Sequence, residues 1–226
     1  MHSYQNQFCL DSPDVIQKNI ASQVKYLQIL SHQPQLTALK MQEAGLSGRV
    51  ILYPEDMHIA DKLGMETAIY VDILSLEEDE LDKISLSGLP VVIPLFDSLQ
   101  KTGEISAKFD TSPARLIENL GFLDRDCTII NPVYADKDDL EILGSYSAKV
   151  VLTPIASSLS GATFANLPLM RKQGLEVSIG TGDSQVIDMY GEIAYLYMTT
   201  LSLLENNKVV TIEEIASLAQ IKGENL

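Results

Sequence analysis

The sequence predicts an α/β protein built around a parallel sheet, and two observations lead to this class. Short runs rich in Val, Ile and Leu alternate with capped helical segments along most of the 226 residues. These apolar runs are nearly continuous, as expected of parallel strands that are covered on both faces. Strand–helix alternation of this kind forms βαβ units. No linker or internal repeat interrupts it, so we expect one domain over residues 1–226.

The first part of the chain predicts helices. Ser12 is a good N-cap, and a stripe of apolar residues follows it at helical spacing: Ile16, Ile20, Val24, Leu27 and Leu30. This pattern predicts one helix that ends before Pro34. A second helix is expected over residues 36–44, closed by Gly45. Residues 1–45 are therefore expected to form an N-terminal helical segment.

Strand candidates follow this segment, separated by helices with readable caps. Ser112 and Pro113 open one of these helices, and Gly121 closes it. The sheet could be an open doubly wound sheet or a (β/α) barrel. No phosphate-binding glycine motif follows a strand, which gives a nucleotide-binding sheet little support. The strand candidates are residues 49–53, 68–73, 91–96, 128–131, 150–153 and 177–180.

Composition excludes several classes of function. Acidic residues outnumber basic ones by 31 to 16, and a net charge of −15 repels nucleic acid and anionic membrane surfaces. No apolar run reaches the roughly 18–20 residues that cross a bilayer, and no signal-peptide pattern opens the sequence. We therefore expect a cytoplasmic protein. Cys9 and Cys127 match no metal-binding or redox spacing, and a reduced, buried Cys127 is expected.

Two segments in the second half of the chain combine strand ends, turns and helices in a distinctive order. In residues 113–143, a helix ends in a Gly-x-Leu-Asp turn, a strand ends at Asn131, and an acidic helix follows Asp136. In residues 150–183, one strand ends at Thr153-Pro154 and the next at Gly-Thr-Gly-Asp. The order of these features resembles the amidohydrolase superfamily, in particular its cytosine deaminase and chlorohydrolase branch. The resemblance covers about half of the chain, roughly from residue 91 onwards.

The resemblance implies a (β/α) TIM-barrel-like fold, which we expect to be incomplete. A full barrel takes ~250 residues, and this family usually adds a β-sandwich domain. With about six recognisable strands, the helical segment 1–45 would replace the first strands, and no sandwich domain is expected. An open barrel exposes strand edges and an apolar interior. We therefore expect a homodimer, or a complex with a complete amidohydrolase or a pathway enzyme.

In active family members, a zinc or iron ion lies at the C-terminal ends of the barrel strands. Its ligands are a His-x-His pair on the first strand, histidines on the fifth and sixth, and an aspartate on the eighth. The three histidines of this chain, His2, His32 and His58, all precede the matching region. Pro94 and Asn131 stand at the fifth- and sixth-strand positions, and Gly182 precedes Asp183 at the eighth. The resemblance therefore predicts neither a metal nor another cofactor.

Five polar residues remain as candidates for a pocket. Asp97 stands where the family has the acid of His-x-x-Glu, Tyr134 stands where a second histidine is common, and Ser157 lies in no G-x-S-x-G motif. The other two candidates are Asn131 and Asp183.

Three hypotheses follow. The first is a degenerate amidohydrolase-like protein that acts as a non-catalytic subunit or binding protein. The second is an enzyme with a metal-free pocket, in which Asp97, Asp183 and Tyr134 supply acid–base catalysis. The third is a metal-dependent amidohydrolase, a deaminase or other C–N bond hydrolase, whose missing ligands come from a partner chain.

Overall fold

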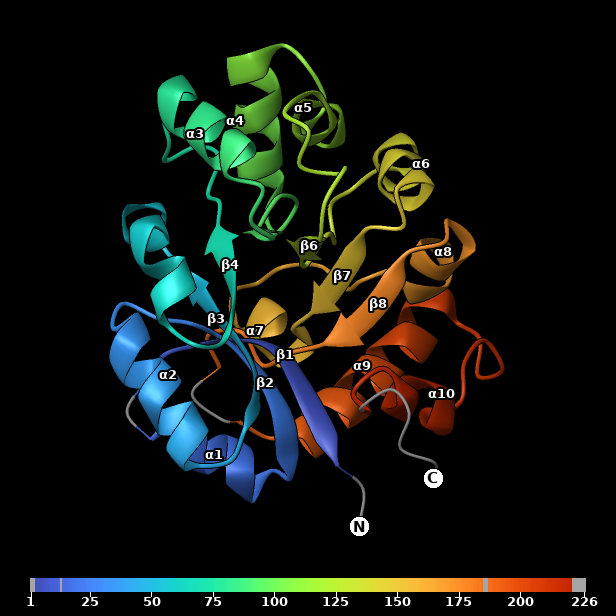
Figure 1. Ribbon diagram of the computed structural model, residues 1–226. Helices are drawn as coiled ribbons and strands as arrows, with labels where there is room; N and C mark the ends of the chain where they lie inside the picture. The colour runs from blue at the N-terminus through green and yellow to red at the C-terminus, as the bar shows by residue number, and fades with distance from the viewer. Residues whose placement is uncertain (1–2, 13, 185–186, 221–226) are drawn as a thin grey trace.

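Eight parallel strands form the centre of the molecule, and the helices surround them (Figure 1). The computed structural model describes residues 3–12, 14–184 and 187–220. Each strand pairs with the next one along the chain, so the strand order is the sequence order. The strands are β1 (Tyr4–Leu10), β2 (Val24–Leu30), β3 (Ser47–Leu52), β4 (Glu66–Tyr70), β5 (Val91–Ile93), β6 (Cys127–Ile130), β7 (Lys149–Leu152) and β8 (Glu176–Ile179).

The first and last strands meet at their C-terminal ends and nearly close the barrel. Leu10 N–H donates to the Gly182 carbonyl, and Thr181 N–H donates to the Phe8 carbonyl, both at 2.9 Å. Gly180 permits this approach, because a Cβ at that position would lie 2.6 Å from the Phe8 carbonyl oxygen. The expected TIM-barrel-like fold is confirmed. All the named strands of the described residues belong to this barrel.

The expected helical segment over residues 1–45 is wrong, and with it the replacement of the first strands. Helix α1 (Val15–Ala21) is short, and Gln23 then takes a left-handed conformation (φ 60°) that turns the chain into β2. Strand β2 pairs with β1 on one side and β3 on the other. The barrel therefore has eight strands, not six, and its first two strands are present.

The helices lie in the connections between the strands and pack on the outer face of the barrel. The main apolar core lies between these helices and the strands. Helix α7 crosses one end of the strand ring in Figure 1. After α1 they are α2 (Pro34–Glu43), the 3-10 helix η1 (Pro54–Lys62), α3 (Glu78–Ser87), α4 (Leu99–Phe109), α5 (Pro113–Asn119), α6 (Lys137–Ser145), α7 (Pro154–Leu159), α8 (Leu167–Lys172), α9 (Met189–Leu204) and α10 (Ile212–Ser217).

A second, smaller apolar cluster lies inside the barrel. It contains one residue from each of seven strands: Phe8, Leu30, Ile51, Ala68, Val92, Ile130 and Val151. Because side chains alternate along a strand, residues two positions before and after these also face inward. The exception is the irregular stretch of β1 between Asn6 and Cys9, where Asn6 bonds to Asn19 of α1 on the outside. The cluster thus divides the barrel interior into a space at the C-terminal strand ends and a space at the N-terminal strand ends.

Two further sequence expectations can be compared with the structure. Both cysteines, Cys9 and Cys127, are buried free thiols, as expected for Cys127. None of the helices in the described part of the chain combines the length and the apolar composition of a membrane span.

Candidate functional site

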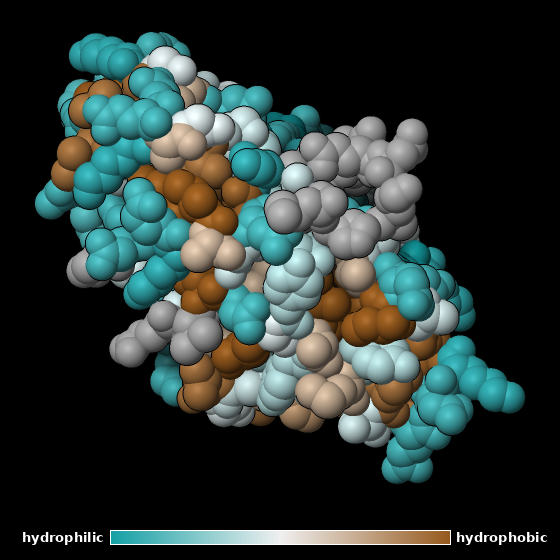
Figure 2. All heavy atoms as spheres, turned by 90° about the horizontal axis from the view of Figure 1, so that it is seen from below, coloured by the Kyte–Doolittle hydropathy of each residue, from teal (hydrophilic) through white to brown (hydrophobic). Residues whose placement is uncertain are grey.

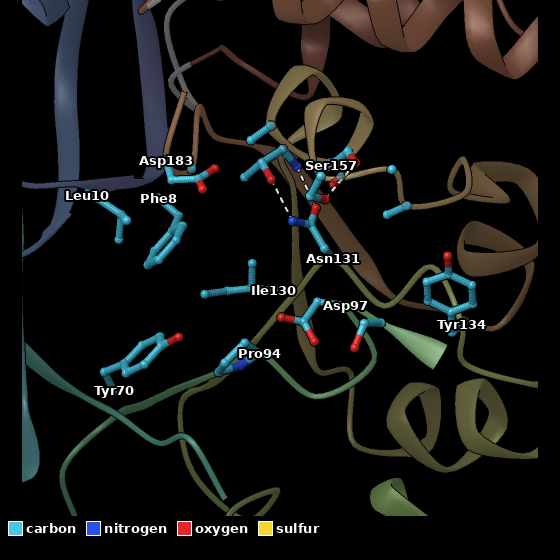
Figure 3. A pocket seen from close by; sticks show the side chains of 17 residues that line it. Phe8, Leu10, Tyr70, Pro94, Asp97, Ile130, Asn131, Tyr134, Ser157 and Asp183 are labelled. Atoms are coloured by element: carbon cyan, nitrogen blue, oxygen red, sulfur yellow. Dashed lines mark hydrogen bonds between the residues drawn. The ribbon is translucent and has the colours of Figure 1, made fainter. Parts of the chain in front are cut away.

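A cavity of about 490 Å³ opens at the C-terminal ends of the strands, and we call it the rim cavity. Catalytic and binding sites of (β/α) barrels lie at this end of the strands. The five polar candidates from the sequence come from four different connections, and all of them line this one cavity (Figure 3): Asp97, Asn131, Tyr134, Ser157 and Asp183.

The end of β1 supplies the apolar wall of the rim cavity. Phe8 and Leu10 line the cavity, whereas Cys9 between them is 1% exposed and absent from its lining. This i, i+2 pair occupies the strand end where the resemblance implies a His-x-His motif. The motif is therefore replaced by Phe-Cys-Leu, and its strand is not deleted. Neither Phe8 nor Leu10 offers a side-chain atom that can bind a metal.

Asn131 is tied to the next strand. It follows β6 in a left-handed conformation (φ 48°) that Asn tolerates better than most residues. Its side-chain Nδ2 donates to Thr153 Oγ1 at 2.5 Å, and its Oδ1 accepts from Thr153 N–H at 2.7 Å. Both ends of the amide are thus used in joining the ends of β6 and β7.

Asp97 is the candidate acid of the cavity. Burial raises the pKa of its carboxyl group, and the ammonium group of Lys101, 4.0 Å from Oδ2, opposes this rise. Lys101 also lies 3.1 Å from Asp72 Oδ1, so its charge is shared between two carboxylates. The other oxygen of Asp97, Oδ1, is buried without a hydrogen-bond partner among the described residues. Asp97 can therefore both accept a ligand hydrogen bond and hold a proton more readily than an exposed aspartate.

Tyr134 and Ser157 line the cavity from the connections that follow β6 and β7. The Tyr134 hydroxyl accepts from Thr163 N–H at 3.2 Å, and in Figure 3 this ring stands well apart from Phe8 and Leu10. Ser157 belongs to α7, whose Ile155 N–H donates to Glu192 Oε2 at 2.9 Å. No histidine lines the cavity beside Ser157 in the described part of the chain, so the serine has no base of the hydrolase type there.

Gly182 and Asp183 follow β8. Gly182 has φ 59°, and a Cβ there would lie 3.1 Å from Thr153 and 3.2 Å from Ala156. A larger side chain at this position would therefore have to displace its neighbours. The next residue, Asp183, is exposed and places its carboxylate in the cavity, one position after the aspartate that the resemblance implies.

The side chains at the family's ligand positions do not fit a zinc or iron ion. Catalytic zinc sites use three protein ligands drawn from histidine, carboxylate and thiolate groups. Here the positions carry Phe8 and Leu10, Pro94, Asn131 with its amide already bonded, and Gly182. In the described part of the lining the carboxylates are Asp97 and Asp183, which are too few for such a ligand set.

Sequence reasoning missed an aromatic stack at the rim. His32, which was expected at a helix end, instead follows β2, and its ring stacks on Tyr53 with 4.2 Å between centroids. Tyr53 meets Tyr70 edge-on at 5.9 Å, and Tyr70 lines the cavity. The available signal was an aromatic residue at the end of each of two neighbouring strands. His58 is an exposed residue of η1, and His2 lies outside the described residues.

Comparison with known proteins finds relatives in the same superfamily that the sequence resembles. No family model matches the chain. The 5-methylthioadenosine/S-adenosylhomocysteine deaminase of Caldicellulosiruptor saccharolyticus is 25% identical over 136 residues, 59% of this chain and 32% of that protein. The enzyme of the same name from Pyrococcus furiosus is 25% identical over 137 residues, 59% and 33% of the two chains. The homologues of this chain are members of the amidohydrolase superfamily. The matches span about a third of these relatives' length.

Solved structures of amidohydrolase-superfamily members share the fold. An adenosine deaminase from Xanthomonas campestris, solved with bound zinc, superposes with a TM-score of 0.82 and 12% identity. The match covers 90% of this chain and 53% of that one. A guanine deaminase from C. acetobutylicum, with guanine bound, gives a TM-score of 0.79 and 12% identity over 92% and 59% of the two chains.

Proposed function

We propose that this amidohydrolase-like barrel binds a small organic ligand in the rim cavity without a catalytic metal ion. It would act as a binding protein or a non-catalytic subunit. The observation that carries the proposal is the set of side chains at the strand ends, where Phe8 and Leu10, Pro94 and Asn131 replace the histidines that the resemblance implies. The strand ends that hold them are present and in order.

The cavity keeps features that suit a ligand. Its volume of about 490 Å³ lies in the range of small-molecule sites, ~300–1,000 Å³. Apolar side chains form one wall, and the carboxylates of Asp97 and Asp183 provide hydrogen-bond acceptors. A site with few polar groups on an apolar wall can orient a ligand without metal coordination.

The test combines metal analysis with binding. We expect purified protein to contain no stoichiometric zinc or iron, and EDTA-treated protein to bind at least one of three probes in calorimetry: 5′-methylthioadenosine, adenosine or guanine. Asp183→Asn and Asp97→Asn should each weaken binding about tenfold, the loss of one charge-assisted hydrogen bond. Asp124→Asn, the same change at an exposed position, should leave affinity unchanged.

Two results would contradict this proposal. Stoichiometric metal together with release of ammonia from a probe would favour the metal-dependent deaminase that the relatives' names suggest. The second candidate, metal-free acid–base catalysis, is favoured by the raised pKa and unpartnered oxygen of Asp97 among the described residues. Turnover of a probe in EDTA that Asp97→Asn abolishes would establish that reaction class instead.

A further inference from the structure

A second cavity, also about 490 Å³, lies at the opposite end of the barrel, and we call it the lower cavity. It is lined by inward-facing residues at the N-terminal ends of the strands, including Gln7, Gln28, Arg49, Thr128 and Ser178. The apolar cluster inside the barrel separates it from the rim cavity. Leu218 and Gln220 border it as well. Gln5 N–H near the start of β1 donates to the Ala219 carbonyl at 2.8 Å, which holds this segment against the strand.

The polar side chains of the lower cavity are only partly satisfied by one another. Gln28 is 6% exposed, and its Nε2 donates to Gln7 Oε1, while its own Oε1 has no partner among the described residues. Arg49 is 8% exposed, and its Nε–H also has no partner within the described part of the chain. A buried donor and a buried acceptor left unpaired each destabilise the folded protein, because each has lost its hydrogen bonds to water. A small rotation of the Gln28 amide, whose last torsion is soft, can turn Oε1 toward the cavity.

Charge balance at this end of the barrel favours a neutral ligand. The Arg49 guanidinium lies 2.8 Å from Asp126 Oδ2 and 3.6 Å from Glu66 Oε2. Lys149 lies 2.8 Å from the other oxygen of Asp126. Both cations therefore already have carboxylate partners. An anion would have to compete with these pairs.

We propose that the lower cavity binds a small neutral polyhydroxylated compound, a sugar or a cyclic polyol. Each hydroxyl group of such a ligand both donates and accepts, which matches the unpaired Gln28 oxygen and the unpaired Arg49 Nε–H of the described residues. The ring of Tyr26 offers the apolar surface that the C–H face of a sugar ring needs. The site shares no residue with the described lining of the rim cavity, so its failure would leave the proposed function untouched.

Titration of ¹⁵N-labelled protein with myo-inositol and with D-glucose tests the proposal. We expect saturable shifts of the Gln7 and Gln28 side-chain amides and of Arg49 Nε–H for at least one probe. Gln28→Met keeps the side-chain length but removes the acceptor, and it should weaken binding at least tenfold. Gln100→Met, the same change on the exposed face of α4, should bind as the parent does.

Three outcomes would overturn the proposal: no saturable shifts with either polyol, shifts that Gln28→Met leaves unchanged, or saturable binding of sulfate in place of the polyols. The last result would make the lower cavity an anion site. If Gln28→Met fails to fold, Thr128→Val gives an independent test, since Thr128 lines the same cavity from β6 and the change should lower affinity at least threefold.

Discussion

At the residue scale, the substituted ligand positions serve the structure of the barrel itself. Asn131 and Gly182 both have positive φ. Asn131 forms two hydrogen bonds with Thr153 at the end of β7. A Cβ added at Gly182 would lie 3.1 Å from the same threonine, so the missing side chain leaves room for Thr153. Asn131 and Thr153 thus join the ends of β6 and β7, and Gly182 lets the chain after β8 pass close to them beneath the rim cavity. Their identities thus have a structural reason that is independent of any ligand.

Gly182→Ala tests this packing. The new Cβ would lie within 3.2 Å of Thr153 and Ala156, in a conformation already strained for alanine. We expect the free energy of unfolding to fall by about 2–4 kcal/mol, measured by urea denaturation. Gly88→Ala is the matched control, because Gly88 has φ 70° and a Cβ added there would meet nothing within 4 Å. It should cost only the backbone strain, about 1 kcal/mol. Equal losses at the two sites would show that contact with Thr153 is unimportant.

At the scale of elements, a buried carboxyl group joins α9 to the start of α7. Glu192 is fully buried, and its Oε2 accepts from Ile155 N–H, while Oε1 has no hydrogen-bond partner among the described residues. Burial raises the pKa of Glu192 to about 8, and the backbone hydrogen bond only partly opposes this rise. Because α7 carries Ala156 and Ser157 along the rim cavity, Glu192 positions one wall of the candidate site.

Glu192→Gln should therefore change how stability depends on pH. Between the unfolded pKa of 4.5 and the folded value of about 8, the folded state holds a proton that the unfolded state has lost. The free energy of unfolding must then fall as pH rises through this window. Glutamine removes the titration. As the pH rises from 5 to 8, the free energy of unfolding of the variant should therefore gain about 1–3 kcal/mol relative to that of the parent. Thermal unfolding at both pH values measures this. The exposed Glu213→Gln should show no such gain, and a gain equal to it would refute a buried, protonated Glu192.

The strands show what the sequence could and could not predict. All six expected strands exist, since runs such as residues 91–93 and 150–152 are too short and too continuously apolar for amphipathic helices. Strand β2 was missed because Val24, Leu27 and Leu30 continue the helical spacing of α1. The turn at Gln23 that separates the two elements involves a residue with no strong turn signal. Strand β1 was missed because its Gln-Asn-Gln stretch is polar. The two glutamines face the barrel interior, and the asparagine between them forms buried hydrogen bonds with Asn19 and Thr181.

The sequence located the candidate site but did not predict all of the residues that line it. Asp97, Asn131, Tyr134, Ser157 and Asp183 follow strands that the sequence marks clearly, and parallel strands bring their C-terminal ends together. Phe8, Leu10 and Tyr70 could not be placed there, because the strand β1 was not recognised and Tyr70 lay inside a longer expected strand. The lower cavity was not foreseen for a related reason, since Gln5, Gln7, Tyr26 and Gln28 in its walls come from β1 and β2.

At the scale of the whole molecule, self-association has to overcome a net charge of −15 and therefore needs an uncharged surface. The open barrel first expected would have supplied strand edges, but the barrel is nearly closed. Helix α9 offers a better surface, because its single charged residue, Glu192, is buried. Its outer face carries residues at helical spacing that are exposed or half-buried: Tyr190, Ala194, Tyr197, Met198 and Leu201. The face of the molecule seen in Figure 2 shows apolar patches between polar side chains.

We propose that two copies of this chain pair through α9 about a two-fold axis. The helix is about 24 Å long, so an antiparallel pair could form the centre of an interface of standard size. Light scattering after gel filtration should give twice the monomer mass for the parent protein. Met198→Glu, at a side chain that is 55% exposed, should give monomers because it places two charges close to the axis. Leu86→Glu, at an 87% exposed position on α3, should remain dimeric. A monomeric parent, or a dimeric Met198→Glu variant, would show that α9 is not the contact.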